Sequence, residues 1–167
     1  MSAQDPSSPY DAIGTGLAFA LTGVYFILVG LGELPVPGGE DAIHGPGAIV
    51  VCAGAAFLFA GLALAIRCKV GAKDRDGELP ADAPRWSHVA YRIAGIAVAG
   101  SLAAIGTWIA IGSGPRAFSV SGPFVEMRTT GEAIGRTVFG LGAVIVWIYV
   151  IALTVGTVRK LFGRGGG

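Results

Sequence analysis

The chain has 167 residues, of which 53% are hydrophobic and only 14% are charged, and its mean hydropathy is +0.67. Soluble domains usually hold ~25% charged residues, so this deficit of charge predicts that lipid surrounds most of the protein. The net charge of +1 offers no field that would attract a polyanion, and nucleic acid is therefore not an expected partner.

The chain opens with a polar segment and a first apolar one. Residues 1–11, MSAQDPSSPYD, are rich in Ser and Pro and lack the Lys and Arg that begin a secretory signal. We expect a disordered cytoplasmic leader here. Residues 12–32 then continue without a charge, and a transmembrane helix needs ~20 mainly apolar residues. This segment is expected to remain in the membrane.

Three further segments meet the same requirement, and they cover residues 45–66, 88–111 and 137–158. Four apolar spans in so short a chain leave too little polar surface to coat a soluble core. The sequence therefore predicts an all-α, polytopic membrane protein whose four transmembrane helices occupy residues 12–158.

Basic residues predict the orientation, because short cytoplasmic loops carry an excess of Lys and Arg. The loop 67–87 holds five basic residues and the tail 159–167 holds three, whereas the connections 33–44 and 113–131 hold two between them. We expect both termini and the loop 67–87 in the cytoplasm. The Ala/Gly-rich composition favours the inner membrane of a bacterium.

The stretch Gly112–Glu132, GSGPRAFSVSGPFVEMRTTGE, is the larger of the two outward connections. Its two Gly-Pro steps are typical of turns. Phe118 and Phe124 suit the depth of the lipid headgroups, where aromatic residues are favoured. Arg116 and Arg128 could meet an anionic ligand or the carboxylates of a partner. We interpret this stretch first as a solvated hairpin, and the functional alternative is an outward binding surface formed by these four residues.

Glycines recur at intervals of seven residues in three of the four spans. In lipid, small residues let helix backbones approach closely, and a seven-residue period keeps one stripe facing a partner in a left-handed crossing. We expect the packing seams of a compact, left-handed four-helix bundle. The glycines are Gly16, Gly23, Gly30, Gly47, Gly54, Gly61, Gly135 and Gly142.

The two halves of the chain also carry a hint of duplication. YDAIGTGLAFAL in the first half and YRIAGIAVAGSL in the second share four residues at matching offsets. The protein would then consist of two helical hairpins inserted in the same sense, as a parallel two-fold repeat.

Charged residues lie at the rims of the spans, and the middle of each span has no Asp, Glu or Lys. Ionisable residues inside a membrane usually mark proton relays and ion pathways, so this pattern argues against a proton-coupled carrier. Glu33 and Arg136 lie at matching depths, as do Asp11 and Arg92. We expect these two pairs to act as structural anchors across helices.

The cysteines and histidines predict neither a cofactor nor a metal site. Cys52 and Cys68 are separated by about 24 Å along one helix, beyond the reach of a disulfide. His44 and His88 fall on opposite membrane faces and cannot share a haem or a metal ion.

Trp147 and Tyr149 lie near the middle of the fourth span, away from the membrane interface that aromatic residues prefer. Buried aromatic residues of this kind usually have a hydrogen-bond partner. Thr22, Ser101 and Thr107 are the candidates.

One part of the chain resembles a known family. A polar acidic loop is followed by HGPGAIVVCAGAAFLFAGLALAIR, in which a Gly-Pro-Gly step leads straight into the second span. Residues 12–67 thereby resemble the small four-helix subunit of tripartite tricarboxylate transporters, and the rest is similar to small bacterial membrane proteins. The resemblance implies an accessory subunit that supports a larger permease and an extracytoplasmic binding protein.

Three functions remain open at this point. The preferred one is a non-enzymatic accessory or scaffold subunit of a membrane complex, with lipids and other membrane subunits as partners. The alternative is a homo-oligomeric channel or small-solute facilitator whose pore is lined by Thr, Ser, Gly and the Trp147/Tyr149 pair. A membrane enzyme that acts on lipid through the rim carboxylates and arginines is the least favoured.

Overall fold

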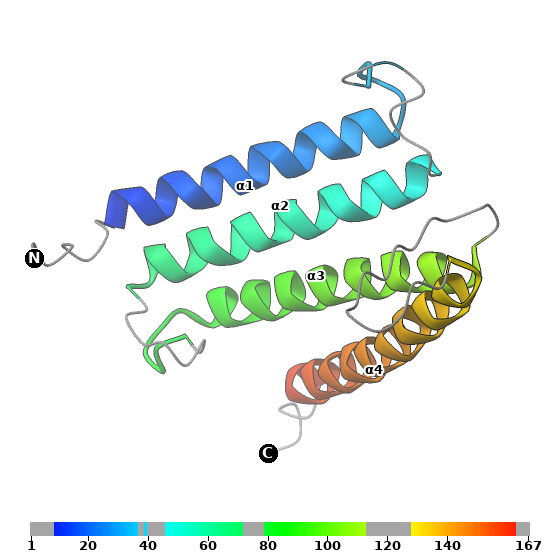
Figure 1. Cartoon of the computed structure of the whole chain (residues 1–167). Helices are drawn as coiled ribbons and strands as arrows, with labels where there is room; N and C mark the ends of the chain where they lie inside the picture. Colours follow the sequence, from blue (N-terminus) through cyan, green and yellow to red (C-terminus); the bar gives the residue numbers. More distant parts are fainter. Residues whose placement is uncertain (1–8, 37–38, 40–45, 72–78, 113–127, 163–167) are drawn as a thin grey trace, which may run out of the picture.

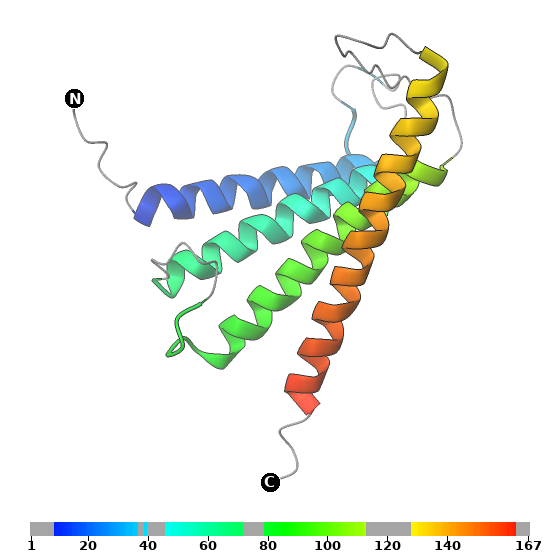
Figure 2. The same ribbon diagram turned by 60° about the horizontal axis from the view of Figure 1, so that its bottom comes forward.

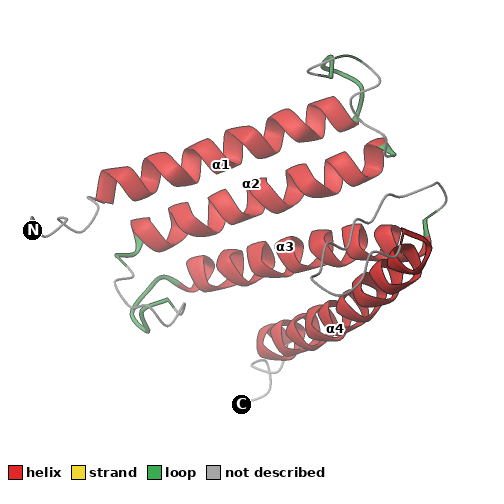
Figure 3. Ribbon diagram, in the orientation of Figure 1, coloured by secondary structure: helices red, strands yellow, loops and turns green. Residues whose placement is uncertain are grey.

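The computed structural model describes residues 9–36, 39, 46–71, 79–112 and 128–162. All regular structure in this part of the chain is helical (Figure 3). The helices are α1 (Pro9–Gly30), α2 (Gly47–Lys69), α3 (Arg85–Ile111) and α4 (Arg128–Phe162). Each is long and apolar enough to cross a membrane. The expected all-α fold with four candidate spans is confirmed, and the chain belongs to the class of multi-pass membrane proteins.

Proline marks the start of two helices. Pro46 and Pro84 are the N-cap residues of α2 and α3, with φ of −59° and −54° and extended ψ values. A proline ring fixes φ near this value and has no N–H group, so it suits the chain just outside a first helical turn. Both helices therefore begin at the residue that follows a proline.

Glycine ends α1. Gly32 has a φ of +80°, which an L-residue with a side chain rarely adopts. Its N–H group donates to the carbonyl of Val29 at 3.0 Å, and the N–H of Glu33 donates to the carbonyl of Leu28 at 2.9 Å. This pair of bonds is a Schellman motif, which satisfies the last carbonyls of a helix.

The helices alternate in direction and pack in chain order (Figure 1). Within the described residues α2 contacts α1 and α3, and α3 contacts α2 and α4, but α1 contacts neither α3 nor α4. The start of α1 and the end of α4 lie at the same end of this row, together with the end of α2 and the start of α3 (Figure 1).

This row is more open than the compact bundle that we expected from the sequence. In a closed bundle α4 would pack against α1, whereas here α4 crosses the row obliquely on the far side of α3 (Figure 2). An open row is physically reasonable in a membrane, because lipid tails solvate apolar helix faces and little hydrophobic force drives the helices to close. The left-handed crossing stays a prediction.

Seven of the eight predicted span ends differ from the observed helix ends, six of them by two to four residues. α1 begins at Pro9, inside the expected leader, and α4 extends from Arg128 to Phe162, into both the outward hairpin and the basic tail. The apolar runs placed the spans correctly but could not show how far each helix continues beyond the apolar part. At 1.5 Å per residue the 35 residues of α4 measure about 52 Å, more than the ~30 Å of hydrocarbon that a helix must cross.

The fully buried side chains of the row are small, and many large apolar side chains are exposed. Ala94 and Ala103 on α3 are fully buried, whereas Leu141, Ile145 and Ile148 on α4 are 62–67% exposed. This distribution is the reverse of a water-soluble core and is typical of helices whose outer faces contact lipid.

Candidate functional site

Six of the predicted glycines face one another across α1 and α2. The helices are antiparallel, so the first glycine of one meets the last glycine of the other. An added Cβ atom at any of the six would lie within 3.1 Å of the partner glycine's carbonyl oxygen. We call this contact the glycine seam, and its pairs are Gly16 with Gly61, Gly23 with Gly54 and Gly30 with Gly47.

The middle pair shows why only glycine fits. A Cβ atom on Gly23 would lie 2.6 Å from the carbonyl oxygen of Gly54 and would overlap the backbone nitrogen of Leu58. A Cβ atom on Gly54 would lie 2.6 Å from the carbonyl oxygen of Gly23. Real Cβ atoms do not approach backbone atoms so closely. The Cα hydrogen of each glycine occupies this space instead, and weak Cα–H···O contacts of this kind recur between helices.

The predicted glycines of α4 lie elsewhere. A Cβ atom on Gly142 would meet nothing within 4 Å, and the residue is exposed. Gly156, fourteen residues further on, is also open in this way. Gly135 is half-buried near the start of α4. Gly142 and Gly156 therefore do not take part in the contact with α3.

A second seam, between α3 and α4, was not predicted. A Cβ atom on Gly106 would lie 3.3 Å from that of Ala143, and one on Gly140 would lie 3.4 Å from that of Ala110. These are ordinary or slightly tight contacts, so α3 and α4 approach less closely than α1 and α2. A signal was present in the sequence, since the buried positions Ala143, Val150 and Thr157 of α4 recur every seven residues, but these residues are not glycines.

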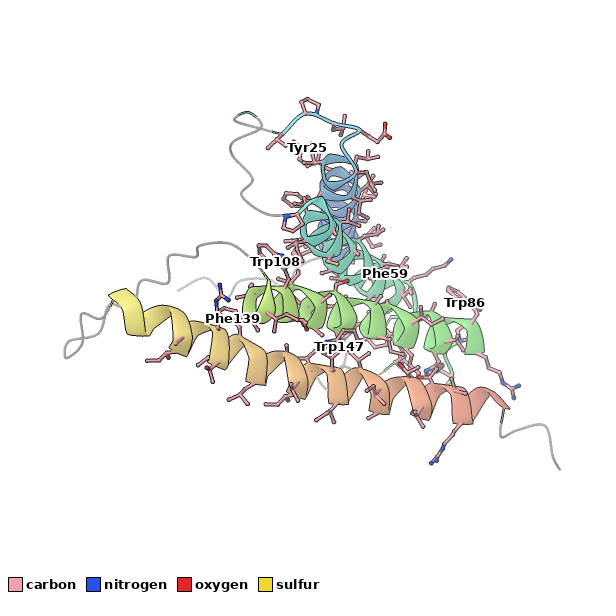
Figure 4. The ribbon with its side chains drawn as sticks, turned by 90° about the vertical axis from the view of Figure 1, so that its right-hand side faces the viewer. Tyr25, Phe59, Trp86, Trp108, Phe139 and Trp147 are labelled. Carbon is pink, nitrogen blue, oxygen red and sulfur yellow. The ribbon has the colours of Figure 1, made fainter. Side chains whose placement is uncertain are left out.

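A hydrogen bond between side chains crosses the same seam. The indole N–H of Trp147 donates to Oγ1 of Thr107 at 3.1 Å, and the Thr107 hydroxyl donates to the carbonyl of Ala103 at 2.7 Å. Trp147 lies between α4 and α3 (Figure 4). The expectation that Trp147 has a hydrogen-bond partner is confirmed, and Thr107 is the one of the three candidates that supplies it.

The two rim pairs are not brought together. Glu33 is exposed in the turn after α1 and Arg136 is half-buried in α4, on helices that make no contact. Arg92 is exposed on α3, which does not contact α1 either, and the side chain of Asp11 lies outside the described part. α2 and α3 separate the helices that carry Glu33 and Arg136.

The candidate outward surface falls mostly outside the described residues. Arg116, Phe118 and Phe124 belong to the segment 113–127, which the structure does not describe. Arg128 is the first residue of α4, and its side chain is likewise not described.

The cysteine and histidine residues form no site in the described part of the chain, and Trp86 makes a contact between two helices. Cys52 and Cys68 are half-buried free thiols, as expected. His88 is half-buried near the start of α3, whereas His44 is not described, and no cluster that could hold a metal ion occurs among the described residues. The ammonium group of Lys69 lies 5.6 Å from the ring centre of Trp86, a cation–π contact that joins the end of α2 to the start of α3.

A groove of about 630 Å³ lies between α2, α3 and α4. Arg67, Tyr91, Arg92 and Thr157 line it at the end where α2 and α4 finish and α3 begins. The rest of the lining is mainly apolar and includes the outer side of Tyr149, which is 57% exposed. The sequence did not predict this groove. Arg67 and Arg92 lie near the ends of two spans, where basic residues indicate orientation, and only the arrangement of the three helices shows that both line one groove.

Comparison with protein-family models, with curated proteins and with solved structures finds no match for the chain. The resemblance of residues 12–67 to a small transporter subunit therefore stays a prediction from sequence motifs. A function has to be inferred from the contacts described above.

Proposed function

We propose that this protein is a non-enzymatic accessory subunit of a bacterial inner-membrane complex, held there by packing of α4 against a helix of another chain. The observation that supports the proposal most directly is that two glycines of α4 do not contact any other described helix at their Cβ positions. Gly142 and Gly156 lie fourteen residues apart, which is twice the glycine interval of α1 and α2, with Tyr149 midway between them, and a Cβ atom on either glycine would meet nothing within 4 Å in the described structure.

Glycine in a helix has a cost that a contact must offset. It is less favourable than alanine by about 1 kcal/mol in a helix interior, so a regular series of glycines implies a benefit elsewhere. In α1 and α2 the benefit is close backbone approach. The same reasoning assigns the glycines of α4 to a close approach by a helix that this chain does not itself provide.

The open row agrees with this role. Among the described helices α4 contacts only α3, and its remaining faces carry large exposed side chains such as Leu141 and Ile148. A partner helix can therefore reach α4 without displacing any helix of this chain. The pattern of residues 12–67 would fit such a subunit in a tripartite transporter, with a larger permease as the partner.

The channel alternative receives less support. Its proposed pore used Trp147, but the Trp147 indole donates its hydrogen bond to Thr107 inside the α3–α4 contact. The polar group of Trp147 is thus already paired within one chain, although the ring is 40% exposed.

Replacing Gly142 by Leu tests the accessory role. Because a side chain at Gly142 meets nothing within 4 Å, the Gly142→Leu chain should fold as well as the wild type. It should, however, lose the partner when the tagged protein is gently extracted from its native membrane and its mass is measured. We expect a complex well above the 16.9 kDa of the chain for the wild type and a lone chain for the variant.

Gly14→Leu is the matched control, because Gly14 on α1 is also exposed and also faces open space. It should leave the complex intact. A wild-type protein that is extracted as a lone monomer would contradict the proposal. A mass that is a multiple of this chain alone would favour the homo-oligomer, and solute flux in liposomes that contain only this protein would then test the channel.

A further inference from the structure

Most polar residues that line the groove between α2, α3 and α4 lie at one end, and Tyr149 is the polar residue in the rest of the lining. Arg67 from α2 and Arg92 from α3 line this end, with the hydroxyl groups of Tyr91 and Thr157 beside them. Arg67 is half-buried, whereas Arg92 is exposed. Arginine stays protonated and presents several N–H donors in a planar fork that suits phosphate oxygens. The polar end thus has the chemistry of a phosphate site.

The groove as a whole, polar end included, has about the length of one lipid leaflet. Along α4 the lining extends from Thr157 to Val146, and eleven residues of helix measure about 16 Å. Half of a hydrocarbon core of ~30 Å is a similar distance. The groove therefore begins at the depth of a headgroup and ends near the middle of the membrane.

The groove also has room for a chain and an opening toward the membrane. Its volume of about 630 Å³ lies within the ~300–1,000 Å³ that is usual for ligand sites. α2 and α4 make no contact with each other in the described structure, so the groove is not closed between them. Gly95 on α3 lines the groove and has nothing within 4 Å of its Cβ position, which leaves a smooth path along the helix.

Among the residues that the structure describes, the charged groups near the polar end are mainly basic. Lys69, Arg85 and Arg159 are exposed at the same end of the row, and Asp82 is the carboxylate described there. This is the end that the distribution of basic residues assigns to the cytoplasm. The cytoplasmic leaflet carries anionic lipids, and basic pockets between transmembrane helices on that side are typical sites for their headgroups.

We propose that the groove binds one anionic phospholipid of this leaflet, with its phosphate on Arg67 and Arg92 and one acyl chain along Gly95 and Ala99. A lipid satisfies both parts of the lining at once, which a free phosphate or a purely apolar helix does not. The site does not depend on the accessory role and would exist in the isolated chain.

Native mass spectrometry of the full chain tests the headgroup contact. The protein is supplied with phosphatidylglycerol or phosphatidylcholine that have the same acyl chains. We expect phosphatidylglycerol to be retained at least about tenfold better, because each arginine near an anionic headgroup contributes about 1 kcal/mol. The double variant Arg67→Gln/Arg92→Gln should lose this preference.

The control variant Arg85→Gln/Arg159→Gln removes the same charge at the same end, from residues that do not line the groove. It should retain phosphatidylglycerol within about twofold of the wild type, since each charge-assisted contact at the groove is left in place. An equal loss in both variants would show a diffuse surface attraction and overturn the site. If Arg67→Gln prevents folding, Arg92→Gln alone gives the same comparison, because that side chain is exposed.

Gly95→Leu tests the acyl-chain path. A leucine there would extend into the groove without meeting the protein near its Cβ atom, so the chain should fold normally but retain neither lipid. Unchanged retention in this variant would overturn the proposal. Release of the lipid by millimolar inorganic phosphate would do the same, because the site would then recognise a free anion. A protein subunit found in the groove in place of lipid, through a photo-crosslinker at position 95, would also overturn it.

Discussion

Thr107 connects two helices through one hydroxyl group. Its oxygen accepts a hydrogen bond from Trp147 of α4, and its proton is donated to the carbonyl of Ala103 one turn earlier in α3. A tryptophan N–H group in the middle of a membrane needs such an acceptor, because neither lipid tails nor water provide one there. The position of Trp147 within an apolar span was therefore informative, since it predicted a polar partner on a neighbouring helix.

Thr107→Val should destabilise the contact between α3 and α4. Valine has a similar shape but no acceptor, so the Trp147 indole loses its partner. Side-chain hydrogen bonds between membrane helices contribute about 0.6 kcal/mol on average and up to about 1.7 kcal/mol, and we expect a loss in this range. The free energy of unfolding is measured by titration with a denaturing detergent.

Thr137→Val is the control for this experiment, because the Thr137 hydroxyl donates only to the carbonyl of Ala133 in its own helix and is exposed. It should leave the free energy of unfolding nearly unchanged. In the background of Trp147→Phe, the Thr107→Val substitution should lose most of its effect. If the two substitutions are additive, the hydrogen bond does not contribute to stability.

Among the helices, α1 and α2 form the closest pair, and glycine is the cause. The seven-residue spacing was visible in the sequence and identified which residues could approach another backbone. The spacing could not identify which helix the glycines of each span would contact. The structure joins the stripes of α1 and α2 and leaves that of α4 open, a difference that depends on the direction and order of the helices. The same order separates Glu33 from Arg136.

Gly23→Ala should destabilise the α1–α2 hairpin, because even one methyl group would overlap the backbone of Leu58. Forced overpacking of this kind usually costs about 1–3 kcal/mol. Gly14→Ala on the same helix meets nothing and should be neutral or stabilising by up to about 1 kcal/mol, since alanine favours the helix. Detergent titration of both variants gives the comparison, and equal stabilities would refute the seam as a source of stability.

The two helices of the first hairpin, α1 and α2, contact each other in a different way from the two helices of the second, α3 and α4. Glycine faces glycine between α1 and α2, whereas Gly106 and Gly140 face alanines between α3 and α4. Gly14 and Gly95, which match in the two similar sequence stretches, both face open space. A duplication of one ancestral hairpin remains a prediction, and the seams themselves do not repeat.

For the whole molecule, composition predicted the class of protein and the four apolar segments predicted the number of helices, because a segment with so few charges has few ways to satisfy its backbone in lipid other than as a helix. Composition was not enough to predict whether the helices close into a bundle. Closure depends on small differences between helix contacts and lipid contacts. For the same reason the groove, with Arg67 and Arg92 on two different helices, became visible only in three dimensions.

The orientation of the row can be tested with tags on both termini. The basic residues predict that both tags are accessible only from the cytoplasmic side, and four crossings are consistent with termini on one side. Protease access to right-side-out and inverted vesicles measures this. A C-terminal tag that is cleaved from outside would contradict the predicted topology and would also move the basic groove to the other leaflet.

The pairing of α1 with α2 alone has a consequence for biosynthesis. Every contact that α1 makes with another described helix is available as soon as residue 69 has been made, before α3 exists. The first hairpin can therefore assemble while the ribosome is still translating the second half of the message. A truncated polypeptide released at that stage would already contain a completed glycine-to-glycine interface.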